Sequence, residues 1–185
     1  MKSKTVELHS ELIERCKVGD RAAQYEVYQL YQRAMFNTAV RICGSLEDAE
    51  DALQESFVSA FAKLSQYRAE ASFGSWLKRI VINNALNFLN KQGKLGEKTE
   101  LTEVNEPFYE WQDIPDYSVT IEKVKEAVLS LPAGFRSVLT LYLFEGYDHR
   151  EIADIMGISE STSKSQFNRA KKKLREQLNE EVKYG

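Results

Sequence analysis

The 185-residue sequence contains no run of about 18 apolar residues and no signal-peptide pattern, so we expect a soluble, cytoplasmic protein without a membrane-inserted segment. Cysteine and histidine are scarce. Cys16 and Cys43 lie too far apart for a CxxC motif, and His9 and His149 complete no zinc ligand set, so we expect no metal. No GxxxxGK[ST] loop and no nucleophile–base constellation occur. The sequence therefore predicts neither a nucleotide cofactor nor an enzyme.

Alternating β-type patterns are also lacking, which predicts an all-α fold. Apolar periodicity and capping residues predict helices over about 5–18, 20–42, 45–64, 72–93, 119–130 and 133–145, followed by a pair of helices. Periodicity is lost over 94–118, where Gly, Pro and acidic residues collect. We expect two small helical domains, 1–93 and 119–185, joined by an acidic linker over 94–118. The second is a four-helix domain with a helix-turn-helix.

The net charge of −3 is unevenly distributed along the chain. Residues 97–120 hold one basic and seven acidic side chains, whereas residues 1–96 and 121–185 each carry a small basic excess. Because phosphate binding depends on local basic clusters, the low overall pI does not exclude a nucleic-acid partner.

Residues 145–175 have the pattern of a helix-turn-helix, which presents a recognition helix to the DNA major groove. Asp148 and Glu151 form a capping box that predicts a helix start at His149. Gly157 is placed to end that helix in a left-handed conformation. Either Ser159 or Ser161 can cap the next helix.

The second helix of this motif has one apolar face, which includes Phe167, Ala170, Leu174 and Leu178. The residues predicted to point away from that face are Lys164, Ser165, Gln166, Asn168 and Arg169. The basic residues Lys171, Lys172, Lys173 and Arg175 follow them. Taken alone, the basic run would favour an amphipathic C-terminal helix with a solvated face. The capped helix ahead of it favours DNA binding.

A second candidate nucleic-acid surface lies on the helix over 72–93. Its predicted core stripe is Leu77, Ile80, Val81, Ala85 and Phe88. On another face Arg79, Asn83, Asn87 and Lys91 recur every fourth residue, flanked by Lys78 and Asn84. Cations can hold phosphates and amides can pair with base edges. Tyr67, Phe73 and Trp76 precede or open this helix and could stack on single-stranded bases, although core packing is the alternative for each.

These blocks carry a family resemblance. EDAEDALQESFVSAF, then YRAEASFGSWLKRIVINNALNFL, then the acidic linker and LPAGFRSVLTLYLFEGYDHREIADIMGISESTSKSQFNRAKKKL resemble a bacterial RNA polymerase sigma factor of the extracytoplasmic function (ECF) subfamily over about residues 8–180. The resemblance implies a protein that binds core RNA polymerase, recognises the −10 and −35 promoter elements and helps to melt DNA without ATP. It also implies that an anti-sigma factor controls the protein.

The resemblance also implies particular contacts. The clamp helices of the largest polymerase subunit would be bound by Asp48, Asp51, Gln54 and Glu55. The melted −10 element would be bound by Tyr67, Ser72, Phe73, Lys78, Arg79, Asn83 and Asn87. In the duplex −35 element, Lys164, Ser165, Gln166, Asn168 and Arg169 would enter the major groove, while phosphates would contact Ser161, Thr162, Lys171 and Lys172.

Two features depart from the family pattern. Ser163 stands where relatives often have an apolar residue, which predicts a weakened packing contact, and Ala69 and Ala71 replace residues that are often Gly, Asp or Ser. Two other functions are considered: a helix-turn-helix regulator that acts without binding core polymerase, and a helical protein-interaction adaptor. The separate acidic helix and aromatic-plus-basic surface argue against the first, and the second predicts no DNA dependence.

Overall fold

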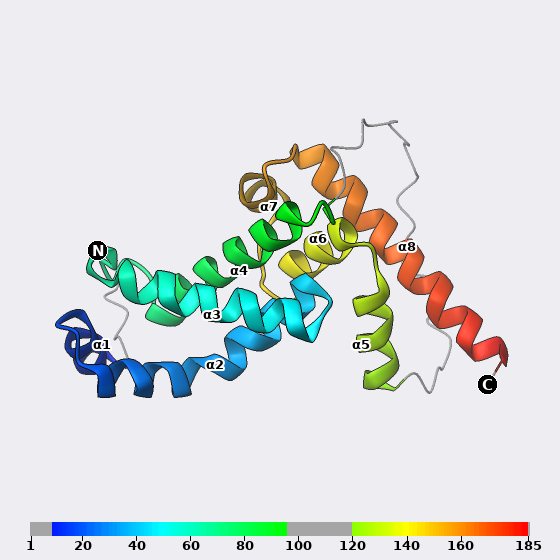
Figure 1. Ribbon diagram of the computed structural model, residues 1–185. Coiled ribbons are helices and arrows are strands. Elements are labelled where there is room, and N and C mark those ends of the chain that lie inside the picture. The colour runs from blue at the N-terminus through cyan, green and yellow to red at the C-terminus, as the bar shows by residue number, and fades with distance from the viewer. Residues whose placement is uncertain (1–8, 96–119, 185) are drawn as a thin grey trace. The chain divides into compact units, whose positions relative to one another are not determined.

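The computed structural model describes residues 9–95 and 120–184, with side chains as far as Leu178 (Figure 1). Within these ranges the chain forms α-helices, one short 3-10 helix and no strand, so the all-α prediction is confirmed. Its residues divide into two compact units, within Met1–Leu89 and Asn90–Gly185. The predicted acidic linker lies outside the described residues except at its first two positions. No described helix combines the length and the apolarity needed to cross a membrane.

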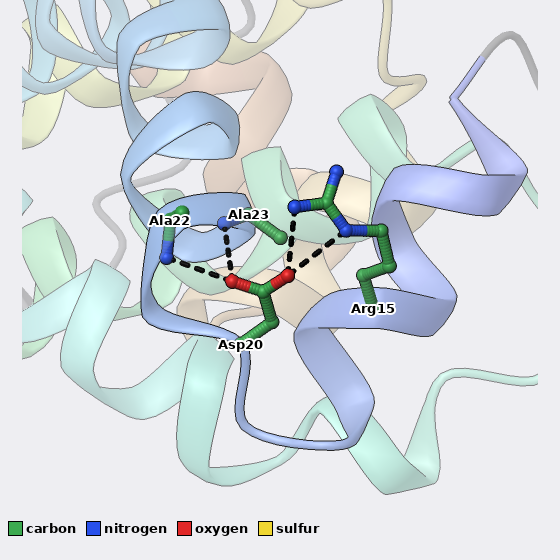
Figure 2. A network of polar contacts seen from close by, with 4 residues as sticks. All are labelled: Arg15, Asp20, Ala22 and Ala23. Atoms are coloured by element: carbon green, nitrogen blue, oxygen red, sulfur yellow. Dashed lines mark hydrogen bonds and ion pairs between the residues drawn. The ribbon is translucent and has the colours of Figure 1, made fainter.

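Asp20 joins the first two helices, α1 (Ser10–Lys17) and α2 (Arg21–Cys43). Its Oδ1 accepts the backbone N–H groups of Ala22 and Ala23 at 2.9 and 3.1 Å (Figure 2). Its Oδ2 accepts from Nε and Nη2 of Arg15 at 2.9 and 2.7 Å. The Ala23 N–H and then Arg15 lower the pKa of the Asp20 carboxyl. One carboxylate therefore caps α2 and ties α1 to it. The first helix was predicted over 5–18. In the described residues it begins at Ser10 and ends at Lys17, and residues 5–8 lie outside the described part.

The turn into α3 (Leu46–Ala62) follows the predicted capping pattern. Gly44 ends α2 with φ 76°, a left-handed conformation that favours glycine. Ser45 caps α3, since its Oγ accepts the Asp48 N–H at 3.3 Å. The helix ends at Ala62 rather than at the predicted residue 64, because the chain tightens into the 3-10 helix η1 (Leu64–Gln66).

Helix α4 (Phe73–Lys91) contacts α2 through the rings of Phe73 and Tyr31 and contacts α3 through Asn84 and Ser56. Gly74 permits this approach, since a Cβ at that position would lie 3.1 Å from Cε1 of Tyr31. The predicted core stripe is partly wrong. Ile80 and Phe88 are only half-buried, and the buried face consists of Phe73, Leu77, Val81, Ile82, Ala85, Leu86 and Leu89.

The second unit consists of α5 (Ile121–Ser130), α6 (Ala133–Leu143), α7 (His149–Met156) and α8 (Glu160–Tyr184). Helix α8 contacts each of the other three (Figure 1). At the break before Pro132, the buried Arg136 donates from Nη1 to the carbonyls of Leu129 and Leu131 at 3.1 and 2.6 Å. The core of the unit includes Leu131, Val138, Leu139, Leu141, Ile152 and Ala170.

Candidate nucleic-acid interface

The helix-turn-helix is built by local hydrogen bonds. Asp148 Oδ1 accepts the Glu151 N–H at 2.8 Å, and Glu151 Oε2 accepts the Asp148 N–H at 2.9 Å, which completes the predicted capping box. Gly157 ends α7 with φ 65° in the left-handed region. Of the two candidate caps for α8, Ser159 serves, because its Oγ accepts the Thr162 N–H at 3.0 Å. Caps at three ends therefore define the turn and the start of α8.

Most residues predicted to contact the −35 element lie on the accessible side of α8. Ser161, Lys164, Asn168 and Lys172 are exposed, and Thr162, Ser165, Arg169 and Lys171 are half-buried. Lys164 Nζ lies 2.7 Å from Glu160 Oε1, one turn earlier. The positions of these side chains allow contact with a duplex.

Gln166 differs from its neighbours and corrects the prediction that it points away from the apolar face. Its Oε1 is buried, and a Cβ built on Gly134 of α6 would lie 3.5 Å from that oxygen. Gln166 sits one position before Phe167, which belongs to the buried face, so its side chain turns toward α6. We therefore do not include Gln166 in the proposed DNA-facing set.

Ser163, at which the sequence predicts a weakened packing contact, is fully buried. A hydrogen bond of 2.9 Å joins its Oγ to Nδ1 of His149, the first residue of α7. The His149 ring stacks on Tyr142 with centroids 4.7 Å apart and meets Phe167 edge-on at 5.6 Å. Burial, and then the charge of Lys164, lower the pKa of His149. This pair was not predicted from the sequence, although a polar residue at a position that is often apolar in the family is a signal of a buried polar partner.

The outward face of α4 carries the predicted cationic and amide stripe. Arg79, Asn83 and Asn87 are exposed at four-residue intervals, and Lys78 beside them is half-buried. Asn84 is different, because its Nδ2 donates to Ser56 Oγ of α3 at 3.1 Å. Its amide is engaged in packing α4 on α3, so the prediction that it flanks the stripe is wrong.

The aromatic residues beside α4 form a cluster within the first unit. Tyr67 is 6% exposed and Phe73 1% exposed, and their ring centroids lie 5.5 Å apart. Trp76 is half-buried, with its ring 5.3 Å from Tyr67 and 5.5 Å from Phe73. Tyr67 also donates its hydroxyl to the Ala71 carbonyl at 2.8 Å. Core packing, the alternative given for these rings, holds for Tyr67 and Phe73, which offer no open face to a base.

The loop between Tyr67 and Ser72 is exposed at its tip. Arg68, Ala69, Glu70 and Ala71 are all exposed, and Ala69 has φ 55°, a left-handed conformation that costs energy for a residue with a Cβ. Ser72 closes the loop as predicted, since its Oγ accepts the Ser75 N–H at 3.2 Å and caps α4. Its oxygen is therefore already partnered within the helix start.

The candidate polymerase-binding face lies on α3. Asp51, Gln54 and Glu55 are exposed and Asp48 is half-buried. An open groove of about 500 Å³ lies beside this face where α2 and α3 meet, and it is lined by Tyr28, Gln29, Gln32, Arg33, Phe36, Glu50, Leu53 and Gln54. The α2 side of the groove was not predicted from the sequence. Among the described residues, no three His, Cys, Asp or Glu side chains are arranged to hold a metal ion.

Comparison with known proteins identifies both units. Residues 27–95 match sigma-70 region 2, and residues 121–174 match sigma-70 region 4. The chain is 29% identical over 180 residues to the RNA polymerase sigma-H factor of Pseudomonas aeruginosa, covering 92% of this chain and 93% of that protein. It is 30% identical over 166 residues to the ECF RNA polymerase sigma factor SigM of Mycobacterium tuberculosis, covering 90% of this chain and 82% of that protein.

A solved structure shows the same fold. The chain is similar to the sigma factor RpoE of Bartonella quintana, solved in complex with the anti-sigma factor NepR, with a TM-score of 0.56 and 24% identity over 84% of this chain and 96% of that one. The fold and the paired regions define a DNA-binding protein of transcription initiation. The chain belongs to the ECF family of RNA polymerase sigma factors. Its function as a sigma factor follows from that membership.

Proposed function

We propose that this sigma factor divides promoter recognition between its two units, with α8 binding the duplex −35 element and α4 binding the −10 element as it opens. The observation that carries the proposal is the capped helix-turn-helix, whose second helix exposes a polar and basic surface from its first turn onward. We assign residues 1–93 to polymerase and −10 binding, residues 119–185 to −35 binding, and residues 94–118 to an acidic linker.

The start of α8 suits a phosphate and base-edge contact. Ser161 and Thr162 lie in its first turn, where backbone N–H groups and the helix dipole favour an anion. Further along the same helix, Lys164, Ser165, Asn168 and Arg169 provide donors suited to the major groove. On approach to DNA, phosphate would compete with Glu160 for the Lys164 ammonium. Lys171 and Lys172 follow Asn168 and Arg169 within about one turn and would hold the DNA backbone.

Helix α4 suits a different state of DNA. Asn83 and Asn87 are exposed amides that can pair with base edges, and Lys78 and Arg79 are cations near the exposed loop. Unpairing a base costs a few kcal/mol, which contacts to the separated strand can offset. Because Tyr67 and Phe73 are buried in the described conformation, we expect the amides, the cations and the loop to contact the separated strand.

The acidic face of α3 and the adjoining groove suit a helical partner of opposite charge. Asp51, Gln54 and Glu55 lie on one exposed surface, and the groove beside them has Phe36 and Leu53 in its lining. A basic coiled coil such as the clamp helices of the largest polymerase subunit would find both charge complementarity and apolar contact there. Transcription would then take place in the cytoplasm, and the sigma factor would contribute binding free energy instead of a catalytic step.

An anti-sigma factor is a further proposed partner. The structurally similar RpoE of Bartonella quintana was solved with NepR, and CnrH, with a TM-score of 0.52, was solved with the cytosolic domain of CnrY. On the second unit Leu143 and Phe144 are 57% and 51% exposed at the end of α6. These apolar side chains would suit coverage by such a protein.

Reconstitution with core RNA polymerase tests the proposal. The purified chain should direct a specific run-off transcript from a promoter selected from genomic fragments, whereas core enzyme alone should not. A helix-turn-helix regulator would shift a duplex operator by itself and give no transcript. An adaptor would show no dependence on DNA sequence. Absence of any specific transcript across the fragment library would contradict the assignment of promoter contacts.

A further inference from the structure

The pair formed by the half-buried His149 and the fully buried Ser163 lies at the junction of the two helices of the helix-turn-helix. Ser163 is on α8 and fully buried, and His149 is the first residue of α7, fourteen positions earlier. Their 2.9 Å hydrogen bond satisfies a hydroxyl that has no access to water. At the start of α7, Asp148 and Glu151 bond to each other in the capping box. His149, between them, bonds to Ser163 of α8.

We propose that the His149–Ser163 hydrogen bond positions α8 on α7 and thereby determines which duplex sequences this sigma factor prefers upstream. His149 and Ser163 act through their neighbours as positioning residues and do not themselves contact DNA. The inference rests on the proposed −35 role of α8 and assigns it a specificity determinant outside the DNA-facing set.

Ser163 lies between residues of α8 that are proposed to contact DNA. Thr162 precedes it on the proposed phosphate-contacting turn, and Lys164 and Ser165 follow it on the proposed groove-facing side. Because a helix turns as a rigid unit, any rotation or shift of Ser163 moves these three neighbours relative to α7. Base-edge hydrogen bonds require donor–acceptor distances within a few tenths of an ångström, so such a movement would change which bases can be bonded.

Two aromatic rings contact the imidazole of His149. Tyr142 of α6 stacks on it with an interplanar angle of 21°, and Phe167 of α8 meets it at 67°. Tyr142 and Phe167 also contact each other, with centroids 4.5 Å apart. The half-buried imidazole therefore contacts rings from two helices, and its Nδ1 bonds to Ser163. An aromatic ring would fill this place equally well, so the hydrogen bond is the specific contribution of histidine.

The experiment separates the hydrogen bond from the packing. Holoenzyme is assembled from core RNA polymerase and the full chain, as wild type, Ser163→Ala, His149→Phe or the double variant. Each is tested on a promoter library with a randomised upstream element and a fixed downstream element, and transcripts are sequenced. The readout is the preference at each upstream position, compared with the total transcript from the whole library. His149→Phe keeps the ring contacts, and the double variant leaves no buried polar atom of the pair unpaired.

Each single variant should reduce preference at one or more upstream positions by about fivefold to tenfold, the size expected for loss of one good base-edge contact. Total transcript over the library should fall much less. In the double variant the two effects should be non-additive, since the residues act as a pair. Lys173→Ala, an exposed change on the same helix outside the proposed contacts, should keep the wild-type preference.

Two different failures can be told apart. If the wild-type holoenzyme shows no upstream preference, the proposed −35 role of α8 is wrong. If the wild type has a clear preference and the folded Ser163→Ala and His149→Phe variants keep it, the positioning role is wrong while the −35 role stands. A uniform loss over all sequences would indicate only a smaller active fraction and would also overturn the inference. If a single variant fails to fold, the double variant provides the test. A double variant that keeps the wild-type preference would contradict the positioning role.

Discussion

The two proposed DNA-binding helices, α8 and α4, present their polar faces in different settings. Helix α8 begins at a turn defined by the caps of Asp148, Gly157 and Ser159. Helix α4 begins at an exposed loop that includes a left-handed alanine, and its neighbouring aromatic rings are buried. The first surface therefore starts at a capped turn, whereas the second consists of exposed amides and cations beside a loop with a left-handed residue.

This difference corresponds to the two states of DNA that the helices would meet. A duplex offers a regular groove, so a prearranged helix can bind it without reorganising. A separated strand has no fixed shape, and a loop held in a costly conformation can change when the strand arrives. The comparison suggests that sequence preference upstream depends on how α8 is packed, while opening depends on exposed side chains of α4 and on its loop.

The largest expected effect tests whether Phe73 belongs to the core. Phe73→Ala removes a ring that is 1% exposed and should lower the free energy of unfolding by about 3–5 kcal/mol. Urea unfolding followed by circular dichroism measures this loss. Asn87→Ala, an exposed change on the same helix, should lower stability by no more than about 0.5 kcal/mol. If Phe73→Ala keeps its stability and is defective only in promoter opening, Phe73 contacts DNA and is not a core residue.

Arg169→Ala tests the duplex side of the comparison. Loss of its guanidinium should reduce discrimination at one upstream base pair by about tenfold, because a good base-edge contact is worth about 1–3 kcal/mol. Competition between promoter variants in run-off transcription with holoenzyme measures the change. An equal reduction on every upstream sequence would show that Arg169 holds phosphate instead of a base.

Asn83→Ala tests the opening side. The variant should initiate several-fold less well on a closed duplex, since removal of one contact of about 1 kcal/mol weakens capture of the separated strand. On a template with a pre-melted bubble the defect should be smaller, because opening is already complete. The ratio of transcripts from the two templates is the measurement. Equal losses on both would contradict a role for Asn83 in opening.

Ala69→Gly tests the strain in the loop. Ala69 has φ 55°, so glycine should raise the free energy of unfolding by about 0.5–1 kcal/mol. Ala71→Gly is the matched control, since Ala71 is exposed in the same loop without a positive φ and glycine there should give no gain. Thermal unfolding of the two variants provides the comparison. Equal changes in both would show that Ala69 stores no strain.

A smaller effect concerns pH and the α7–α8 junction. Burial, and then Lys164, lower the pKa of His149 below its ordinary value of 6.5, and Lys171 acts in the same direction, whereas Glu160 and Asp148 oppose them. The unfolded chain therefore binds a proton more readily at this residue, so the stability of the second unit should fall as the pH drops below about 6.5. Comparison of unfolding curves for wild type and His149→Phe isolates this contribution. The variant should lose part of the dependence, and identical curves would contradict the assignment.

The sequence predicted the described helices and caps well but predicted burial poorly. Asp20, Ser45, Ser72, Ser159, and the Asp148–Glu151 capping box each bond to a backbone group within three residues, so a short window contains the cause. The partners of Asn84 and Ser163 are 28 and 14 residues away. No local pattern specifies such a pair, so the sequence predicted neither hydrogen bond.

The sequence by itself determined the helical character, the helix-turn-helix, the acidic segment and the family, since these depend on periodicity, local capping and motif order. Only the tertiary structure decided which polar and aromatic side chains face inward. Tyr67 and Phe73 are enclosed in a cluster with Trp76, Gln166 turns toward α6, and Ser163 meets His149. The physical reason is that burial is settled by surfaces brought together from distant parts of the chain, where an unpaired polar group is costly and an apolar ring is favoured.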